Sequence, residues 1–154
     1  MVEVAVALAN TADILRILDM IPHRYPLLMV DRVIDMVHDT SATGIKNVTI
    51  NEPQFVGHFP GQPVMPGVMI IESMAQTAAV LVVHTLGGKA EGKFVYFMTI
   101  DRARFRRPVV PGDTMYVKVR KLRNRGNVWK FHADVLVDGN LAAEADFAAM
   151  IVDR

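Results

Sequence analysis

A run of residues from Gly67 to the glycine pair Gly87-Gly88, GVMIIESMAQTAAVLVVHTLGG, is apolar on nearly every side. A helix with that pattern must be buried, either in a globular core or in a membrane. Glu72, Gln76 and His84 interrupt the run and no second apolar span accompanies it, which disfavours a membrane span. The pattern therefore predicts the central helix of a core, which the rest of the chain must cover.

The remaining segments alternate apolar and polar residues with a period of two, as half-buried strands do. The expected strands before the helix are residues 27–37 and 42–50, and the expected tight hairpins after it are at Gly126-Asn127 and Asp138-Gly139. We therefore expect an α+β fold, an antiparallel sheet of about six strands wrapped around one long apolar helix. A dimer could cover what the sheet leaves exposed.

The 154 residues fit a single domain, and 51% of them are apolar, which is enough for a substantial core. We expect one domain over residues 1–154, in which residues 1–10 form a loose N-terminal extension. The chain has no cysteine, and Glu3 stands where a signal peptide would carry positive charge. Both observations favour a cytoplasmic protein.

Charge is segregated along the chain, although the net charge is only +1. Residues 102–130 hold ten of the 17 Lys and Arg residues and a single acid, Asp113, so this stretch carries +9 and the remainder −8. The segregation fits either the solvated faces of two strands or a dock for an acidic partner. The candidates for such a dock are Arg102, Arg104, Arg106 and Arg107.

His58 differs from the other histidines because it lies in the loop of residues 52–67, which leads directly into the apolar helix. Several prolines stiffen this loop, and reactive groups tend to lie on loops held by a rigid frame. An imidazole can take up and release a proton near neutral pH, as a general base must. We interpret the other four histidines, including His23 between two prolines, as structural.

Glu72 is the only carboxylate on the apolar helix. It lies in the second turn, where the helix dipole no longer gives a negative charge much stabilisation, and this weakens a purely structural interpretation. A carboxyl walled by Val68, Ile71 and Ala75 should have a raised pKa, and a raised pKa suits a general acid.

The start of the helix offers a third element. The backbone N–H groups of Gly67 and Val68 lie at the positive end of the dipole and could hold a carbonyl oxygen that gains negative charge. A base, an acid and such an oxyanion site in one loop–helix unit indicate proton transfer next to a carbonyl. There is no Gly-x-Gly-x-x-Gly motif, no P-loop and no His-x-x-x-His cluster, so we expect no cofactor and no metal.

The segment HFPGQPVMPG at 58–67, followed by IIESMAQ at 70–76, closely resembles the 3-hydroxyacyl-[acyl-carrier-protein] dehydratases of bacterial-type fatty acid synthesis. The resemblance is to the branch that also serves lipid A precursors. IPHRYPLLMVDRV at 21–33 and FRRPVVPGD at 105–113 match the same family, so the resemblance covers nearly the whole chain after residue 10. It implies the hot-dog fold, a sheet wrapped around a long helix, in agreement with the fold expected above.

The resemblance also implies roles for residues. The family's catalytic histidine falls on His58, its catalytic glutamate on Glu72 and its backbone donor on Gly67. A sister branch that also isomerises the double bond carries Asp at the position of Glu72, so Glu72 favours a plain dehydratase. In the family each site draws on two subunits of a dimer, and three dimers often form a hexamer. The implied partners are therefore a second copy of the chain and an acyl carrier protein, with no nucleic acid and no membrane.

Two other functions stay open at this stage. A hot-dog thioesterase would hydrolyse the thioester by means of a placed water, and a water site leaves no mark in a sequence. A module that binds nucleic acid would use the basic stretch, but few aromatic residues are interleaved with its charges.

Overall fold

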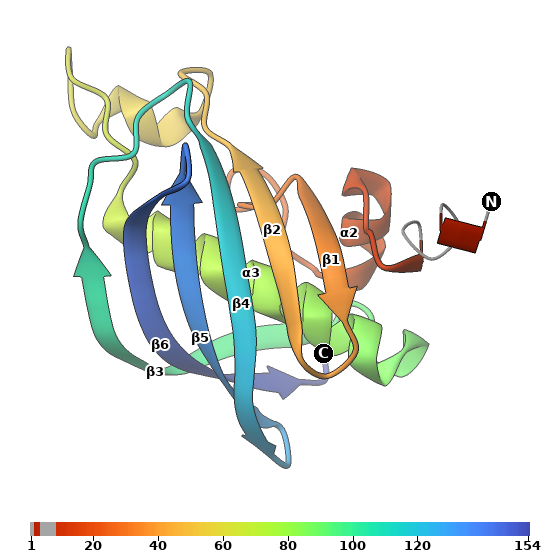
Figure 1. Cartoon of the computed structure of the whole chain (residues 1–154). Helices are drawn as coiled ribbons and strands as arrows, with labels where there is room; N and C mark the ends of the chain where they lie inside the picture. The colour runs from red at the N-terminus through yellow and green to blue at the C-terminus, as the bar shows by residue number, and fades with distance from the viewer. Residues whose placement is uncertain (1, 4–8) are drawn as a thin grey trace.

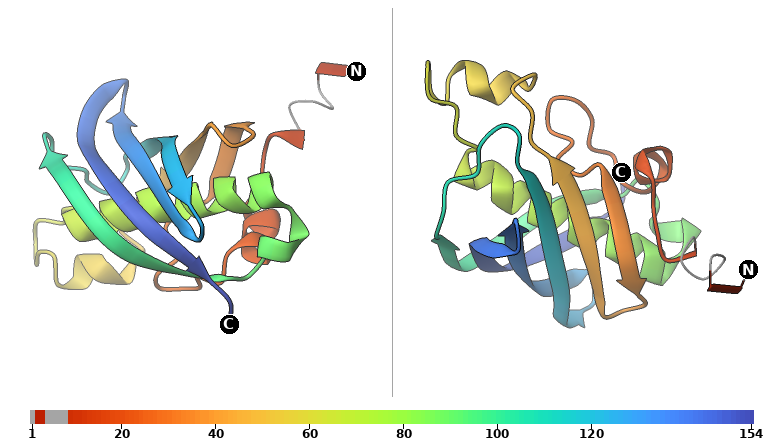
Figure 2. Two further views of the ribbon diagram at one scale, coloured as in Figure 1. Left: turned by 90° about the horizontal axis from the view of Figure 1, so that it is seen from below. Right: turned by 45° about the horizontal axis from the view of Figure 1, so that its top comes forward.

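The computed structural model describes residues 2–3 and 9–154 of the chain. The elements are α2 (Ile14–Met20), β1 (Arg32–Val37), β2 (Ser41–Asn47), η1 (Pro53–Val56), α3 (Gly67–Leu86), η2 (Gly88–Ala90), β3 (Phe94–Phe105), β4 (Thr114–Arg125), β5 (Val128–Val137) and β6 (Asn140–Val152). Six strands form one antiparallel sheet in the order β1-β2-β4-β5-β6-β3. The sheet curls around α3 (Figure 1), which lies in its hollow side in the left view of Figure 2. The expected fold class is confirmed.

Helix α3 is the centre of the core. Thirteen of its 20 residues are buried, and it ends where predicted, because Gly87 takes a positive φ of 81° and donates its N–H to the carbonyl of Val83. By length and composition α3 could also cross a membrane, but 72% of its most apolar stretch is buried within the fold. It is therefore the core helix that the sequence pattern predicted.

Strand β5 shows how the alternating sequence produces the sheet. Trp129, Phe131 and Ala133 are buried on the core side, while the residues between them are partly exposed. The predicted tight hairpins at Gly126-Asn127 and Asp138-Gly139 are both confirmed, since two residues separate β4 from β5 and β5 from β6. Asp138 and Gly139 both have positive φ values, as a type I′ turn requires.

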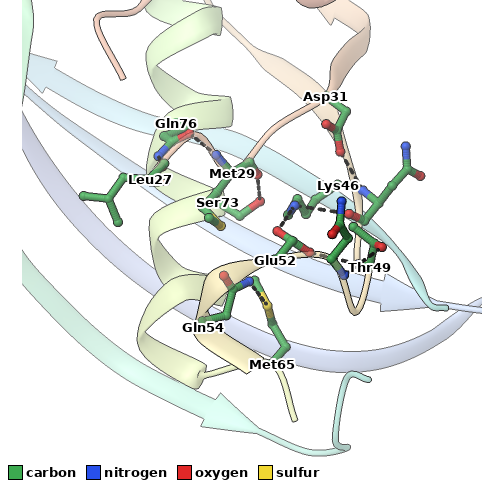
Figure 3. Close-up of polar contacts among 12 residues, drawn as sticks. Leu27, Met29, Asp31, Lys46, Thr49, Glu52, Gln54, Met65, Ser73 and Gln76 are labelled. Atoms are coloured by element: carbon green, nitrogen blue, oxygen red, sulfur yellow. Dashed lines mark hydrogen bonds and ion pairs between the residues drawn. The ribbon is translucent and has the colours of Figure 1, made fainter. Parts of the chain in front are cut away.

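The predicted strand over residues 27–37 begins later than expected, at Arg32. Leu27 and Met29, which precede it, bond to α3 instead of to a neighbouring strand: Gln76 Nε2 donates to the carbonyl of Leu27 at 2.6 Å, and Met29 N–H donates to Gln76 Oε1 at 2.7 Å. Figure 3 shows this side chain between the two backbone positions. The buried side chain of Gln76 thus makes the backbone hydrogen bonds that a neighbouring β-strand would otherwise make. The predicted strand over 42–50 is also shorter, and it ends at Asn47.

The sheet approaches α3 closely at Gly44 of β2. A Cβ atom at this position would lie 2.1 Å from Oγ1 of Thr77, which is far inside van der Waals contact. Glycine is therefore required here for the helix to lie against the strand.

Strand β3 forms one edge of the sheet and is unusually apolar for an exposed edge. Tyr96, Met98 and Ile100 are 57%, 52% and 46% exposed. A long apolar edge strand invites pairing with another chain. The expected loose extension at residues 1–10 lies mostly outside the described residues.

Candidate active site

The loop that carries His58 is fastened to the sheet near both of its ends. Lys46 of β2, only 5% exposed, places Nζ 2.5 Å from Oε1 of Glu52, and Oε2 of Glu52 accepts the N–H of Thr49 at 2.9 Å (Figure 3). At the other end, Met65 donates its N–H to the carbonyl of Val109 at 2.7 Å. The loop is thus held by hydrogen bonds and a buried ion pair.

The position of His58 within this loop fixes which ring nitrogen is free. Val64 donates its N–H to the carbonyl of His58 at 3.0 Å, and Nδ1 of His58 lies 2.6 Å from the carbonyl oxygen of Val64. Because a carbonyl can only accept, Nδ1 carries the proton and Nε2 keeps its lone pair. The ring also stacks on Phe59, with 4.0 Å between ring centroids. His58 therefore presents Nε2 as the ring nitrogen that can accept a proton.

His58 lines a cavity of about 380 Å³ at the start of α3. The cavity is lined by His58, Val64, Met65, Gly67, Ile70, Phe105, Arg106, Arg107, Pro108 and Val109. Most of these side chains are apolar, and two arginines are the only charged ones among them. The cavity combines a base, the start of a helix and an apolar wall, which suits an acyl chain with a polar head.

The backbone N–H groups of the first two residues of α3 have no acceptor in the described part of the chain. Met69 and Ile70 donate to the carbonyl of Pro66, whereas Gly67 and Val68 donate to no acceptor among the described residues. A Cβ at Gly67 would lie 2.9 Å from Phe105 Cε1, so a larger residue would force the Phe105 ring to shift. Free N–H groups at a helix start are suited to hold an oxyanion.

Glu72 lies in a different environment from His58. Burial raises the pKa of its carboxyl, and the hydrogen bond from Gln76 Nε2 to Oε1 at 2.8 Å offsets part of that rise. Of the wall that we expected, Ile71 and Ala75 are buried, but Val68 is 76% exposed. The raised pKa is the property that the sequence predicted for a general acid.

Within one chain, His58 and Glu72 do not line the same cavity. Glu72 lies five positions after Gly67 on α3, so the two positions face directions about 140° apart around the helix axis. Glu72 instead lies 3.5 Å from His23, which lines a second hollow of about 270 Å³ with Pro22, Phe94, Val95 and Tyr96. Within one chain the two residues are thus associated with different hollows.

Sequence reasoning missed the two neighbours of Glu72. The sequence pattern predicts a structural role for His23, and it uses Gln76 only as evidence against a membrane span. The signal that could have identified Gln76 was its spacing, because residues 72 and 76 lie on the same face of a helix that is otherwise apolar. No comparable signal exists for His23, which reaches Glu72 from a distant segment.

The four candidate arginines fall into two groups. Arg106 and Arg107 line the cavity of His58. Arg102 is paired with Asp146, and Arg104 lies opposite Glu144 in the register of β3 and β6, although Glu144 accepts its hydrogen bond from Nε of Arg106 at 3.1 Å. The structure therefore brings two of the four to the site.

The chain matches the FabA-like domain over residues 21–146. It is 68% identical over 145 residues to 3-hydroxyacyl-[acyl-carrier-protein] dehydratase FabZ of Rhodospirillum rubrum, a match that covers 94% of this chain and 91% of that protein. The protein of the same name from Paramagnetospirillum magneticum is 66% identical over 147 residues, covering 96% of this chain and 91% of the relative.

Two solved structures share the fold at low sequence identity. The dehydratase heterocomplex ApeI:P from Xenorhabdus doucetiae has a TM-score of 0.77 at 17% identity, covering 90% of this chain and 91% of that chain. A hypothetical thioesterase with coenzyme A from Streptococcus pneumoniae has a TM-score of 0.58 at 11% identity, covering 79% of this chain and 85% of that chain.

Proposed function

The chain belongs to the FabA-like family of 3-hydroxyacyl-[acyl-carrier-protein] dehydratases, and we propose that it carries out their reaction with His58 as base and Glu72 as acid. The reaction converts a (3R)-3-hydroxyacyl thioester into a trans-2-enoyl thioester and water, a step of fatty acid biosynthesis. The observation that carries the assignment of residues is that His58, with Nδ1 against the carbonyl of Val64, lines the same cavity as Gly67, whose N–H has no acceptor among the described residues.

The proposed elimination balances its protons as follows. Nε2 of His58 takes the proton from C2, while the N–H of Gly67 stabilises the negative charge that develops on the thioester oxygen. The electron pair left at C2 forms the C2–C3 double bond as the C3–O bond breaks. Glu72 gives its proton to the departing hydroxyl, which leaves as water. His58 then releases its proton to solvent, and Glu72 takes up a proton from solvent, which restores both residues.

We further propose that each site is built by two chains of a dimer, and that dimers assemble further into a trimer of dimers. Two observations support the dimer: Glu72 contacts His23 and does not line the cavity of His58, and the apolar edge strand β3 exposes Tyr96, Met98 and Ile100. A single domain over residues 1–154 and a cytoplasmic location belong to the same proposal.

Incubation with a 3-hydroxyacyl thioester on an acyl carrier protein tests the function. We expect ultraviolet absorbance to rise as the conjugated enoyl thioester forms, without release of free thiol. Release of free thiol in place of that absorbance would indicate the rival thioesterase. If a folded protein free of inhibitor gave neither the absorbance nor the free thiol, both enzymatic functions would be contradicted.

We propose that Arg106 and Arg107 steer the acidic carrier to the cavity. Electrostatic attraction at the rim of a site mainly accelerates encounter and orients the partner. Both residues lie in the cavity wall at the end of β3, and the basic residues Arg123 and Arg125 lie at the other end of the sheet, beside the β4–β5 turn (Figure 1). We therefore assign the acidic carrier to Arg106 and Arg107, and not to the rest of the basic stretch.

Reversing both charges, Arg106→Glu with Arg107→Glu, should raise KM for carrier-bound substrate by roughly tenfold at low salt. The increase should shrink as salt rises, because exposed charges are screened over about 10 Å near 0.1 M. Steady-state kinetics with and without the carrier provide the measurement, and turnover of a short carrier-free thioester should change much less. Arg123→Glu with Arg125→Glu is the matched control. Equal effects of the two double variants, or equal losses on both substrates, would contradict the docking role.

A further inference from the structure

His23 is held against Glu72 by a segment that precedes β1. Its Nε2 lies 3.5 Å from Oε1 of Glu72, and the two side chains are 16% and 24% exposed. The guanidinium of Arg24 fastens this segment, since it donates to the carbonyls of Leu18 and Ile21 at 2.7 and 2.9 Å. Hydrogen bonds at catalytic groups are often long before substrate binds and shorten in the complex. His23 is therefore placed to bond the carboxyl of Glu72 during the reaction.

The surroundings of His23 indicate which nitrogen carries its proton. Nδ1 is buried and has no hydrogen-bond partner among the described residues. A buried donor without an acceptor is the less tolerated arrangement, so Nδ1 is the bare nitrogen and Nε2 carries the hydrogen toward Glu72. Burial lowers the pKa of His23, and the charge of Arg24 lowers it further, so the imidazole remains neutral near pH 7.

The two oxygens of Glu72 are not equivalent. Oε1 accepts the hydrogen bond from Gln76 and faces Nε2 of His23, and Gln76 is itself fixed by the backbone at Leu27 and Met29. In the described part of the chain, Oε2 has no hydrogen-bond partner, and it is not among the enclosed side-chain atoms. Oε2 is therefore the oxygen that is open to a substrate.

We propose that His23 is a positioning residue for the dehydration: with Gln76 it holds Oε1 of Glu72, so that Oε2 presents its proton to the departing C3 hydroxyl. The inference rests on the proposed function and adds a residue to it. When Glu72 gives up its proton, the charge is left on a carboxylate whose Oε1 already faces two N–H donors. These donors stabilise the product of the transfer, and they keep the carboxyl from rotating its proton away from the substrate.

The test compares His23→Ala with His23→Gln, which retains a side-chain N–H, and with His38→Ala as a control at the exposed β1–β2 turn. We expect His23→Ala to lower kcat by roughly 10- to 100-fold, with a smaller change in KM, since misplaced groups lose this much in rate. His23→Gln should recover much of that loss, and His38→Ala should match the wild type.

The pH profile of kcat separates positioning from a merely structural role. The groups that face the carboxyl of Glu72 are Gln76 from its own helix and His23, with Arg24 behind it, from the segment before β1. A donor to a carboxylate lowers its pKa, so losing His23 raises the pKa of Glu72 further. Activity that needs protonated Glu72 should then persist to higher pH in His23→Ala, but not in His23→Gln.

The inference would be overturned if His23→Ala had the wild-type kcat and an alkaline limb of the pH profile that does not shift. It would also be overturned if that limb did not shift and the loss of kcat followed a lowered melting temperature. Mixing chains gives a second test. His23→Ala chains mixed with His58→Ala chains should regain activity, whereas His23→Ala mixed with Glu72→Gln should not, because both changes affect the same half of the site. If Glu72→Gln alone were fully active, the proposed acid would be wrong, and this outcome is distinct from a failure of His23 alone.

Discussion

Replacing His58 by alanine is expected to lower kcat for dehydration by roughly 10²- to 10⁴-fold, the usual contribution of a general base. The physical reason is that Nε2 is the only ring nitrogen with a free lone pair, because Nδ1–H is engaged by the carbonyl of Val64. The side chain lies in a loop that Lys46 and Glu52 fasten to the sheet, so the fold should survive the change. Stopped assays of enoyl product at saturating substrate measure the loss.

Circular dichroism should give a melting temperature for His58→Ala close to that of the wild type. His38→Ala, at an exposed turn, controls for the loss of a histidine as such and should retain normal turnover. A folded His58→Ala protein that keeps more than about a tenth of the wild-type rate would exclude His58 as the base, given what such groups contribute.

Glu72→Gln is expected to reduce kcat to a similar extent, since the amide keeps the shape of the side chain but has no acidic proton to give. The same substitution should not destabilise the fold and should stabilise it at higher pH. Burial raises the pKa of Glu72 in the folded protein, so the carboxyl favours folding only when protonated, and that contribution is lost as pH rises through the raised pKa. The neutral amide avoids this loss.

The melting temperature of Glu72→Gln should therefore equal that of the wild type in acid and match or exceed it above the raised pKa of Glu72. Thermal unfolding across this pH range measures the difference. A near-normal rate would reduce Glu72 to a structural charge at the start of a helix. A melting temperature that falls relative to the wild type as pH rises would contradict the sign of its pKa shift.

Mixed chains show whether the two residues act from different subunits. Inactive His58→Ala and inactive Glu72→Gln proteins, after verified subunit exchange, should regain activity, because one site of each mixed dimer then has both residues intact. Continued inactivity would mean that one chain supplies both residues to a site.

The fold was predictable because its signals are local. The apolar run that became α3 could only be a buried helix, and two-residue turns such as Asp138-Gly139 fix the order of adjacent strands. The strand predicted from residue 27 was wrong in its first residues, because Gln76 takes the place of a strand partner there. A side chain that satisfies backbone groups from across the core leaves no periodic pattern in the sequence.

The candidate site was predictable where residue type and loop position coincide, as at His58. His23 was out of reach because 48 residues of chain lie between it and Glu72, and only the folded structure brings the two together. The separation of His58 from Glu72 was implied by the family resemblance and is consistent with the helical spacing of Gly67 and Glu72.

The close approach at Gly44 makes a residue with no chemical role decisive for the reaction. Any side chain there would meet the side chain of Thr77, the neighbour of Gln76, so Thr77 and the part of α3 that carries it would have to shift. Such a movement would carry the Gln76 amide away from Leu27 and Met29, and Glu72 would move with it. Random mutagenesis that selects for lost turnover should therefore recover changes at position 44, and a catalogue of inactivating mutations would include a position that touches no substrate.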